Sequence, residues 1–176
     1  MPLSPNLPPN LSPNLSPNQS TALPVKLSHN FTLAQLTHSD TALKHGIANT
    51  PEPAHLIHLR RLAAGLEQVQ KLLRHPLTIN SAYRNPAVNR LVGGVPGSRH
   101  ALGLAADFVC PAFGTPLEIA RALAASSIPF DQIIHEYGRW VHFGLPAPGD
   151  AARRELLTIR SSAEGYLDGL LDTTPA

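Results

Sequence analysis

The pattern of apolar and polar positions predicts a long amphipathic helix that starts shortly after residue 50. Beyond Leu56, apolar side chains recur at three- or four-residue steps, at Leu59, Leu62, Leu66, Val69 and Leu73. This spacing places them on one face of a helix of roughly twenty residues. The run Thr50-Pro51-Glu52 supplies a capping hydroxyl, a first-turn proline and an acid suited to the positive end of the helix dipole, so we expect the helix to begin there.

Shorter segments that alternate or are rich in apolar residues predict strands. The expected strands are residues 77–81, 104–109, 128–135, 140–145 and 155–159. Two short helices are expected between them, begun by Asn85-Pro86 and by Thr115-Pro116. Because helices and strands are mixed and some strands form hairpins, we predict an α+β fold with a small mixed or antiparallel sheet and flanking helices.

The N-terminus differs in composition from the rest of the chain. Its first eighteen residues contain four repeats of the form Leu-x-Pro-Asn. A proline at every fourth position removes amide donors and prevents a helix or a sheet from propagating. We therefore predict a disordered arm over residues 1–24, one folded domain over 25–172 and a short tail over 173–176.

Charge and cysteine content exclude several classes of protein. Lysine and arginine number 14 against 12 aspartate and glutamate residues, so charge gives no case for a nucleic-acid partner. The single cysteine, Cys110, excludes an internal disulfide framework. No apolar run approaches the roughly 18 residues of a membrane span, and no signal peptide is evident. We expect a monomer that is cytoplasmic as synthesised.

Residues 98–107, Ser-Arg-His-Ala-Leu-Gly-Leu-Ala-Ala-Asp, are the first candidate site. His100 and Asp107 offer a nitrogen and an oxygen ligand to a divalent metal, and Gly103 permits a bend that brings them together. Strand alternation places Asp107 and Cys110 on opposite faces of the strand, so Cys110 is expected to be a buried apolar thiol and not a ligand. Taken alone, this stretch fits a metal site and a hydrogen-bonded histidine–carboxylate pair equally well. The best candidate for a third ligand is His142.

The same stretch resembles a known family. Its residues match the pattern Ser-x-His-x-x-Gly-x-Ala-x-Asp of the zinc D-Ala-D-Ala carboxypeptidases, whose fold is shared with the hedgehog signalling domain. Residues 81–86, Ser-Ala-Tyr-Arg-Asn-Pro, resemble the family's Ser-Gly-Tyr-Arg-Ser-Pro, and residues 130–142 resemble its C-terminal metal segment.

This resemblance implies roles for individual residues. One zinc ion would be held by His100, Asp107 and His142. Arg84 would hold a carboxylate or carbonyl oxygen of the substrate, and Ser98 would be a nearby polar contact. Three protein ligands leave a fourth zinc position for water, which is typical of a catalytic site.

The proton-transfer group departs from the family pattern. Some branches carry an acid three positions before the last zinc histidine, but here that position is Arg139. A three-residue hairpin loop would pair Glu136 with Trp140 and place it on the face of His142. A two-residue loop would instead pair His135 with His142 and turn Glu136 away. We expect Glu136 to be the base, because relatives with the Trp-Val-His ending often carry a glutamate there, with His135 in reserve.

The resemblance implies a zinc peptidase that acts on peptidoglycan stem peptides, as a carboxypeptidase or an endopeptidase. Such an enzyme would reach the cell wall after release or in a phage particle, for example in phage lysis; a cytoplasmic dipeptidase fits equally. One alternative is an inactive zinc-stabilised module that binds the wall or a partner. The other is a non-haem iron oxygenase, which also uses two histidines and a carboxylate, although its first histidine and acid are usually separated by one residue and not by six.

Overall fold

A computed structural model describes residues 24–173 of the chain. Apart from its last residue, the predicted N-terminal arm lies outside the described residues, and so does all but the first residue of the predicted tail. None of the helices in the described part is long and apolar enough to cross a membrane.

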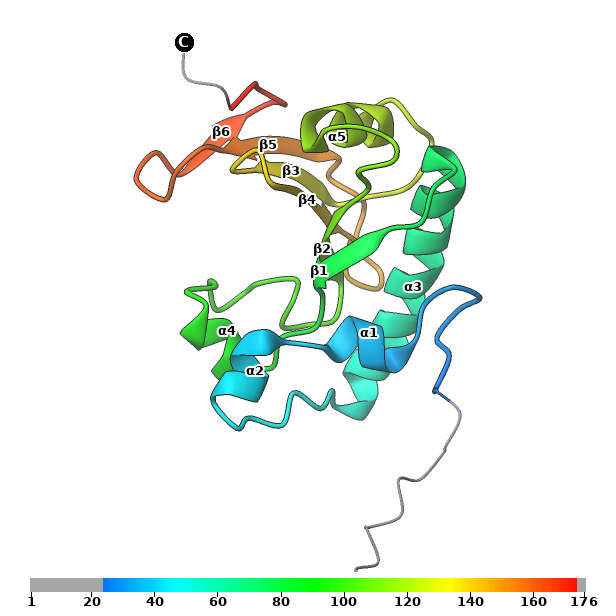
Figure 1. The fold of residues 1–176 in the computed structure, drawn as a ribbon, viewed down its shortest axis with the longest axis vertical. Coiled ribbons are helices and arrows are strands. Elements are labelled where there is room, and N and C mark those ends of the chain that lie inside the picture. Colours follow the sequence, from blue (N-terminus) through cyan, green and yellow to red (C-terminus); the bar gives the residue numbers. More distant parts are fainter. Residues whose placement is uncertain (1–23, 174–176) are drawn as a thin grey trace, which may run out of the picture.

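A six-stranded mixed sheet forms the centre of the fold (Figure 1). Its strands are β1 (Thr78–Ser81), β2 (Ala105–Val109), β3 (Gln132–Glu136), β4 (Trp140–Gly144), β5 (Glu155–Ile159) and β6 (Tyr166–Asp168). They lie in the order β1-β2-β4-β3-β5-β6, and only the pair β3 and β5 is parallel. The predicted α+β class with a small mixed sheet is therefore confirmed.

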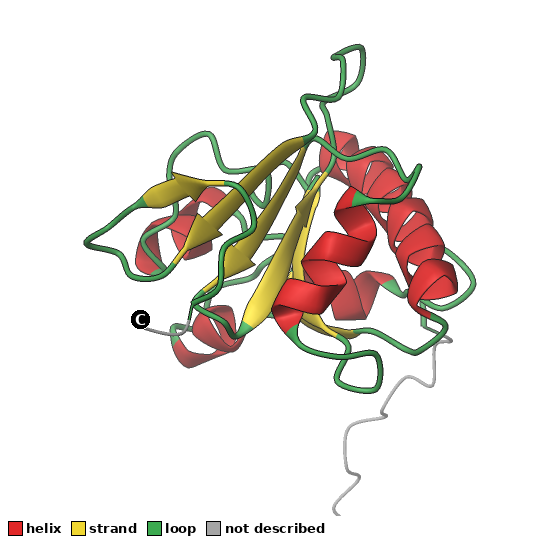
Figure 2. Ribbon diagram, turned by 90° about the horizontal axis from the view of Figure 1, so that it is seen from above, coloured by secondary structure: helices red, strands yellow, loops and turns green. Residues whose placement is uncertain are grey.

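Five helices surround the sheet. They are α1 (Leu33–Thr37), α2 (Asp40–Lys44), α3 (Pro53–Leu73), α4 (Pro86–Leu91) and α5 (Pro116–Ala124). Figure 2 shows the longer helices packed along one side of the strands. Residues of α3 and α5 join the core-facing side chains of β2 and β4 in one buried cluster, which includes Phe108 and Phe143.

The long helix forms where its apolar stripe predicted, but it begins later. Leu59, Leu62, Leu66, Val69 and Leu73 are all buried in the core cluster, and burying each such side chain contributes about 2 kcal/mol. The helix starts at Pro53 with Glu52 at its N-cap, so the prediction of a start at Thr50 is wrong. A residue that precedes a proline is disfavoured in helical conformation, and Glu52 is accordingly extended, with ψ at 159°.

The five predicted strands are present. The strand β3 begins later than expected, at Gln132, so residues 128–131 lie outside it. Asn85 and Thr115 cap α4 and α5 through their side chains, as predicted. The sequence pattern did not reveal α1, α2 or β6. The helices α1 and α2 have five residues each, little more than one turn, and β6 has three, so none of them is long enough to show its period.

Strand register divides the sheet into two faces. One cross-strand row runs through Ser81, Asp107, His142, Ile134, Leu157 and Asp168. Their neighbours along the strands, such as Phe108 and Val141, point into the core instead. Cys110 is also in the core cluster, which confirms the prediction of a buried thiol.

Candidate metal centre

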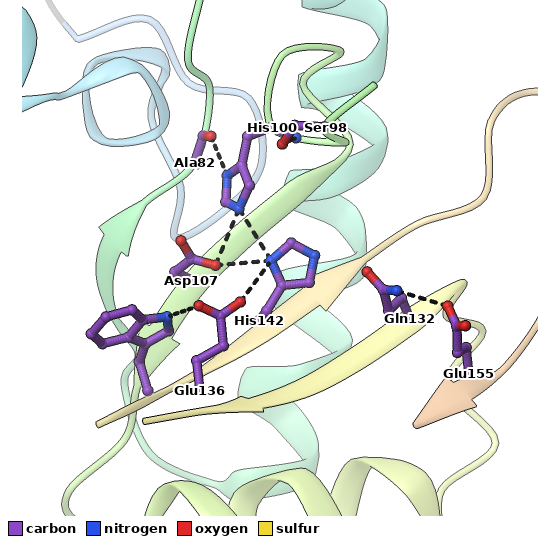
Figure 3. Close-up of polar contacts among 9 residues, drawn as sticks. Ala82, Ser98, His100, Asp107, Gln132, Glu136, His142 and Glu155 are labelled. Atoms are coloured by element: carbon purple, nitrogen blue, oxygen red, sulfur yellow. Dashed lines mark hydrogen bonds and ion pairs between the residues drawn. The ribbon is translucent and has the colours of Figure 1, made fainter. Parts of the chain in front are cut away.

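Three side chains, those of His100, Asp107 and His142, converge on one face of the sheet, as Figure 3 shows. Oδ1 of Asp107 lies 3.1 Å from Nε2 of His100 and 2.9 Å from Nδ1 of His142, and the two histidine nitrogens are 3.1 Å apart. All three residues are buried, and they form the one cluster of convergent metal-ligand atoms found among the described residues.

A backbone contact orients His100, and a nearby glycine leaves room for His142. Nδ1 of His100 lies 2.7 Å from the carbonyl oxygen of Ala82. A carbonyl can only accept, so Nδ1 carries the proton and Nε2 presents its lone pair to the cluster. His142 lies two residues before Gly144, where a Cβ atom would approach Nε2 of the imidazole to 3.3 Å. A glycine at this position therefore leaves room for the ring.

Gly103 provides the predicted bend between His100 and β2. It has a φ of +71°, a conformation that disfavours other residues. A Cβ atom there would lie 3.1 Å from the carbonyl oxygen of His55 in α3. His58, on the same helix, contacts the carbonyl oxygen of Leu102 at 2.7 Å. The loop therefore rests directly on α3, which fixes the position of His100.

The geometry of the cluster suits zinc. Tetrahedral zinc with ligand bonds of about 2.0–2.2 Å places neighbouring ligand atoms roughly 3.3–3.5 Å apart. The three observed separations of 2.9 to 3.1 Å are slightly shorter than this, so an outward shift of a few tenths of an ångström would admit the ion. Two imidazole nitrogens and one carboxylate oxygen are also ligands that zinc accepts readily.

The electrostatics of the cluster favour a cation. Burial lowers the pKa of His100, which keeps its ring neutral and able to ligate. Burial alone would raise the pKa of Asp107, but its close contacts with the two histidines outweigh burial and hold that pKa far below its usual range. The site thus presents an ionised carboxylate beside imidazole lone pairs.

Glu136 lies next to this cluster. The β3–β4 hairpin has a three-residue loop that pairs Glu136 with Trp140, and this places Glu136 on the face of His142. Nε1 of Trp140 donates to Oε2 of Glu136 at 3.0 Å, while Oε1 lies 4.0 Å from Nδ1 of His142. Burial, reinforced by the charge of Asp107, raises the pKa of Glu136.

The other candidate base lies elsewhere. His135 is buried on the opposite face of β3, where its Nδ1 contacts the carbonyl oxygen of Leu171 at 2.9 Å. Because neighbouring strand residues point to opposite faces, the structure does not bring His135 to the cluster. Ser98 does lie at the site, and its hydroxyl accepts a hydrogen bond from the backbone N–H of His100.

Arg84 is a partly buried cation beside the cluster. It makes no ion pair within 4.0 Å in the described part of the chain, and its Nε is a buried donor without a partner there. Burial lowers the pKa of Arg84, and the carboxylates of Asp107 and Glu136 oppose this effect. An arginine remains charged despite such a shift, so its guanidinium is available to an anionic ligand.

All of these groups except His135 open into one cleft of about 870 Å³. Its walls also contain residues that the sequence reasoning missed, namely Arg99, Gln132, Tyr137, Arg153 and Tyr166. Tyr166 reaches the cleft because β6 pairs it with Ile159, which β5 in turn pairs with Glu136. Residues 92–97, which follow α4, line the same cleft, and Figure 1 shows β6 near the upper edge of the fold and α4 near its lower edge.

A family model described as Peptidase M15 matches residues 29–144. The chain belongs to the peptidase M15 family. This finding confirms the resemblance to the zinc D-Ala-D-Ala carboxypeptidases and makes the protein a member of a family of zinc-dependent metallopeptidases. The matched residues include the histidine–aspartate–histidine cluster of this chain, Arg84 and Glu136. Arg153 and Tyr166, which also line the cleft, lie beyond the matched range. No curated protein compared with the chain matches it.

Proposed function

We propose that this M15 protein is a zinc peptidase that hydrolyses peptide bonds in peptidoglycan stem peptides, as a carboxypeptidase or an endopeptidase. One observation carries the proposal: the His100–Asp107–His142 cluster, the acid Glu136 beside it and Arg84, which has no ion-pair partner among residues 24–173, share a single cleft. A volume of about 870 Å³ suits a segment of peptide. Family membership favours this reading over an iron oxygenase with the same ligand types.

His100, Asp107 and His142 would hold the zinc ion. Bound zinc lowers the pKa of a coordinated water to about 7 and polarises the carbonyl of the scissile bond. Glu136 is assigned to proton transfer: Trp140 holds its Oε2, and Oε1 faces the cluster. The raised pKa of Glu136 brings it closer to neutral pH, which suits a group that takes a proton and later delivers it to the leaving amine.

Arg84 and Ser98 are assigned to the substrate. A guanidinium binds a carboxylate through two parallel hydrogen bonds, and Arg84 has no ion-pair partner within the described residues that would compete. A peptide that ends in a free carboxylate would therefore be oriented by Arg84, with its scissile carbonyl over the cluster. Ser98 lines the same cleft and supplies a neutral polar contact.

Digestion of purified peptidoglycan followed by mass spectrometry of the released muropeptides tests the proposal. The zinc-loaded protein should release fragments whose masses identify the bond, and a chelator should abolish the release. Glu136→Gln should lower kcat by about 10²- to 10⁴-fold, the usual contribution of a general base, while zinc binding persists. His135→Asn is the matched control, because His135 lies on the other face of the same strand.

Two results would count against the proposal. Full activity of the Glu136→Gln variant would remove Glu136 from the mechanism. Zinc bound at one equivalent, with no fragments from walls of several stem-peptide types, would instead favour the alternative of an inactive zinc-stabilised binding module.

A further inference from the structure

A second arginine lies in the cleft at the end away from Arg84. Arg99 directly precedes the ligand His100, and its Nε and Nη2 donate to Oδ2 of Asp131 at 3.3 and 3.1 Å. Asp131 is only 1% exposed, so its carboxylate is a fixed anchor. Arg153 donates to both oxygens of the same carboxylate, from Nε at 3.0 Å and from Nη2 at 2.8 Å.

The two arginines differ in what they leave free. Arg153 is engaged further, because its Nη1 lies 3.1 Å from Glu155, which also accepts from Gln132. Arg99 contacts one oxygen of Asp131 only, and its Nη1 has no partner among the described residues. Its side chain is 24% exposed and lines the cleft. Arg99 therefore presents an oriented donor with a positive charge to whatever enters.

The charge of the cleft suits an anionic ligand. Three arginines line it, Arg84, Arg99 and Arg153, together with the carboxylates Asp107 and Glu136. Two more carboxylates, Asp131 and Glu155, pair with Arg99 and Arg153 from outside the lining. With the two positive charges of zinc, the site would carry an excess of one positive charge. A cleft lined mainly by one sign of charge concentrates ligands of the opposite sign.

The two ends of the cleft lie on either side of the metal cluster. Figure 3 shows Gln132 and Glu136 flanking His142, and Asp131 adjoins Gln132 in the chain. Arg84 belongs to the Glu136 end, where it lines a smaller pocket with Trp140. The side chain of Arg99 is instead held at Asp131, next to the Gln132 end.

We propose that Arg99, held by Asp131 beside Arg153, forms a second carboxylate-binding subsite. The preferred substrate is then a peptide with an acidic side chain on one side of the scissile bond, while Arg84 binds the group on the other side. This inference rests on the proposed peptidase function. It narrows the substrate to peptides with two carboxylates, one for each arginine.

Paired substrates test the subsite. Two synthetic stem peptides are compared that differ only in whether the acidic residue is a free carboxylate or its carboxamide. The wild-type protein should favour the carboxylate in kcat/KM by about ten- to a hundredfold, the effect of one charge-assisted hydrogen bond. Arg99→Gln should bring that ratio close to one, and Arg99→Lys should restore part of it. Arg121→Gln, on the exposed side of α5, is the control and should leave the ratio unchanged.

Binding provides a readout that does not depend on cleavage. Calorimetry with the Glu136→Gln protein should show the same preference for the carboxylate peptide, and the added Arg99→Gln change should remove it. Zinc content measured on every variant shows whether His100 has kept its position. A ratio near one in the wild-type protein, or a preference that survives Arg99→Gln, overturns the subsite. Selective binding without cleavage of either peptide upholds the subsite and overturns the proposed function instead.

Discussion

Asp107 is central to the candidate metal site, because its Oδ1 contacts both histidines. Each imidazole would supply a neutral nitrogen, so Asp107 is the one ligand that brings a negative charge to the site. Its depressed pKa means that this charge persists well below neutral pH. A change that keeps the shape of the side chain but removes its charge therefore isolates the electrostatic contribution.

We expect Asp107→Asn to lose zinc. An amide oxygen is a weaker ligand than a carboxylate, and the amide N–H₂ group repels a cation, so zinc affinity should fall by more than about tenfold. The matched control is Asp168→Asn, which lies in the same cross-strand row but is exposed on β6. Elemental analysis after dialysis measures zinc per chain. One equivalent retained by Asp107→Asn would contradict the assignment.

Asp131 makes the stability of the protein depend on pH. Hydrogen bonds from Arg153, strengthened by those from Arg99, hold the pKa of Asp131 at about 2 against the usual 3.8. A depressed pKa gives stability that is present above the unfolded value and is lost as the pH falls toward the folded one. The contribution is about 2 kcal/mol near neutral pH, and roughly half should be gone near pH 3.

Urea unfolding of the wild-type protein and of Asp131→Asn measures this effect. The difference in their free energies of unfolding should be largest at pH 6–7 and should narrow as the pH approaches 3. A difference that stays constant between these values would show that Asp131 contributes no charge-dependent stability.

At the scale of elements, two connections determine where the site residues lie. The β3–β4 hairpin turns through Tyr137 and Gly138, whose φ values are +55° and +66°. This three-residue loop sets the register that puts Glu136 on the face of His142. The second connection is the loop from Ser98 to β2, which bends at Gly103 and carries His100 to the cluster.

Gly103→Ala should weaken both the fold and the metal site. A left-handed conformation disfavours alanine, and the added Cβ would lie 3.1 Å from the backbone of His55 and 3.2 Å from Leu59, both in α3. We expect a loss of about 1–3 kcal/mol in the free energy of unfolding. Gly97→Ala is the control, since a Cβ atom in that glycine would meet nothing within 4 Å. Equal stability of the two variants would show that the bend is not under conformational constraint.

At the scale of the whole molecule, the candidate metal site joins segments that are distant in the sequence. His100 comes from a loop that rests on α3, while Asp107 and His142 come from adjacent strands of the sheet. A metal that binds all three in the folded state stabilises the fold as a unit, because the unfolded chain cannot hold the three ligands together.

Zinc should therefore raise the temperature of unfolding. At a concentration one hundred times its dissociation constant, a ligand of the folded state adds about 2.7 kcal/mol, which corresponds to roughly 5–10 °C for a chain of this length. Scanning calorimetry with and without chelator measures the shift. Magnesium should give a smaller shift, because two of the three ligands are imidazoles. A zinc shift that persists in Asp107→Asn would indicate a different binding site.

The sequence by itself determined the elements whose apolar residues repeat with a helical or strand period. It also determined local features that depend only on neighbouring residues, such as caps and bends. The apolar stripe of α3 and the alternation in β2 depend on neighbours along the chain, so their faces were predictable. The same holds for the bend at Gly103 and for the side-chain caps of α4 and α5. The third candidate ligand, His142, came from the family resemblance and not from spacing.

The tertiary structure decided what depends on contacts between distant segments. The choice between Glu136 and His135 as neighbours of the cluster rested on the hairpin register, which local sequence left open. The pairing of Arg99 with Asp131 joins residues 32 positions apart, and Tyr166 reaches the cleft through two successive strand pairings. Such contacts are set by how the sheet is ordered and not by any sequence period, so only the folded chain reveals the second end of the cleft.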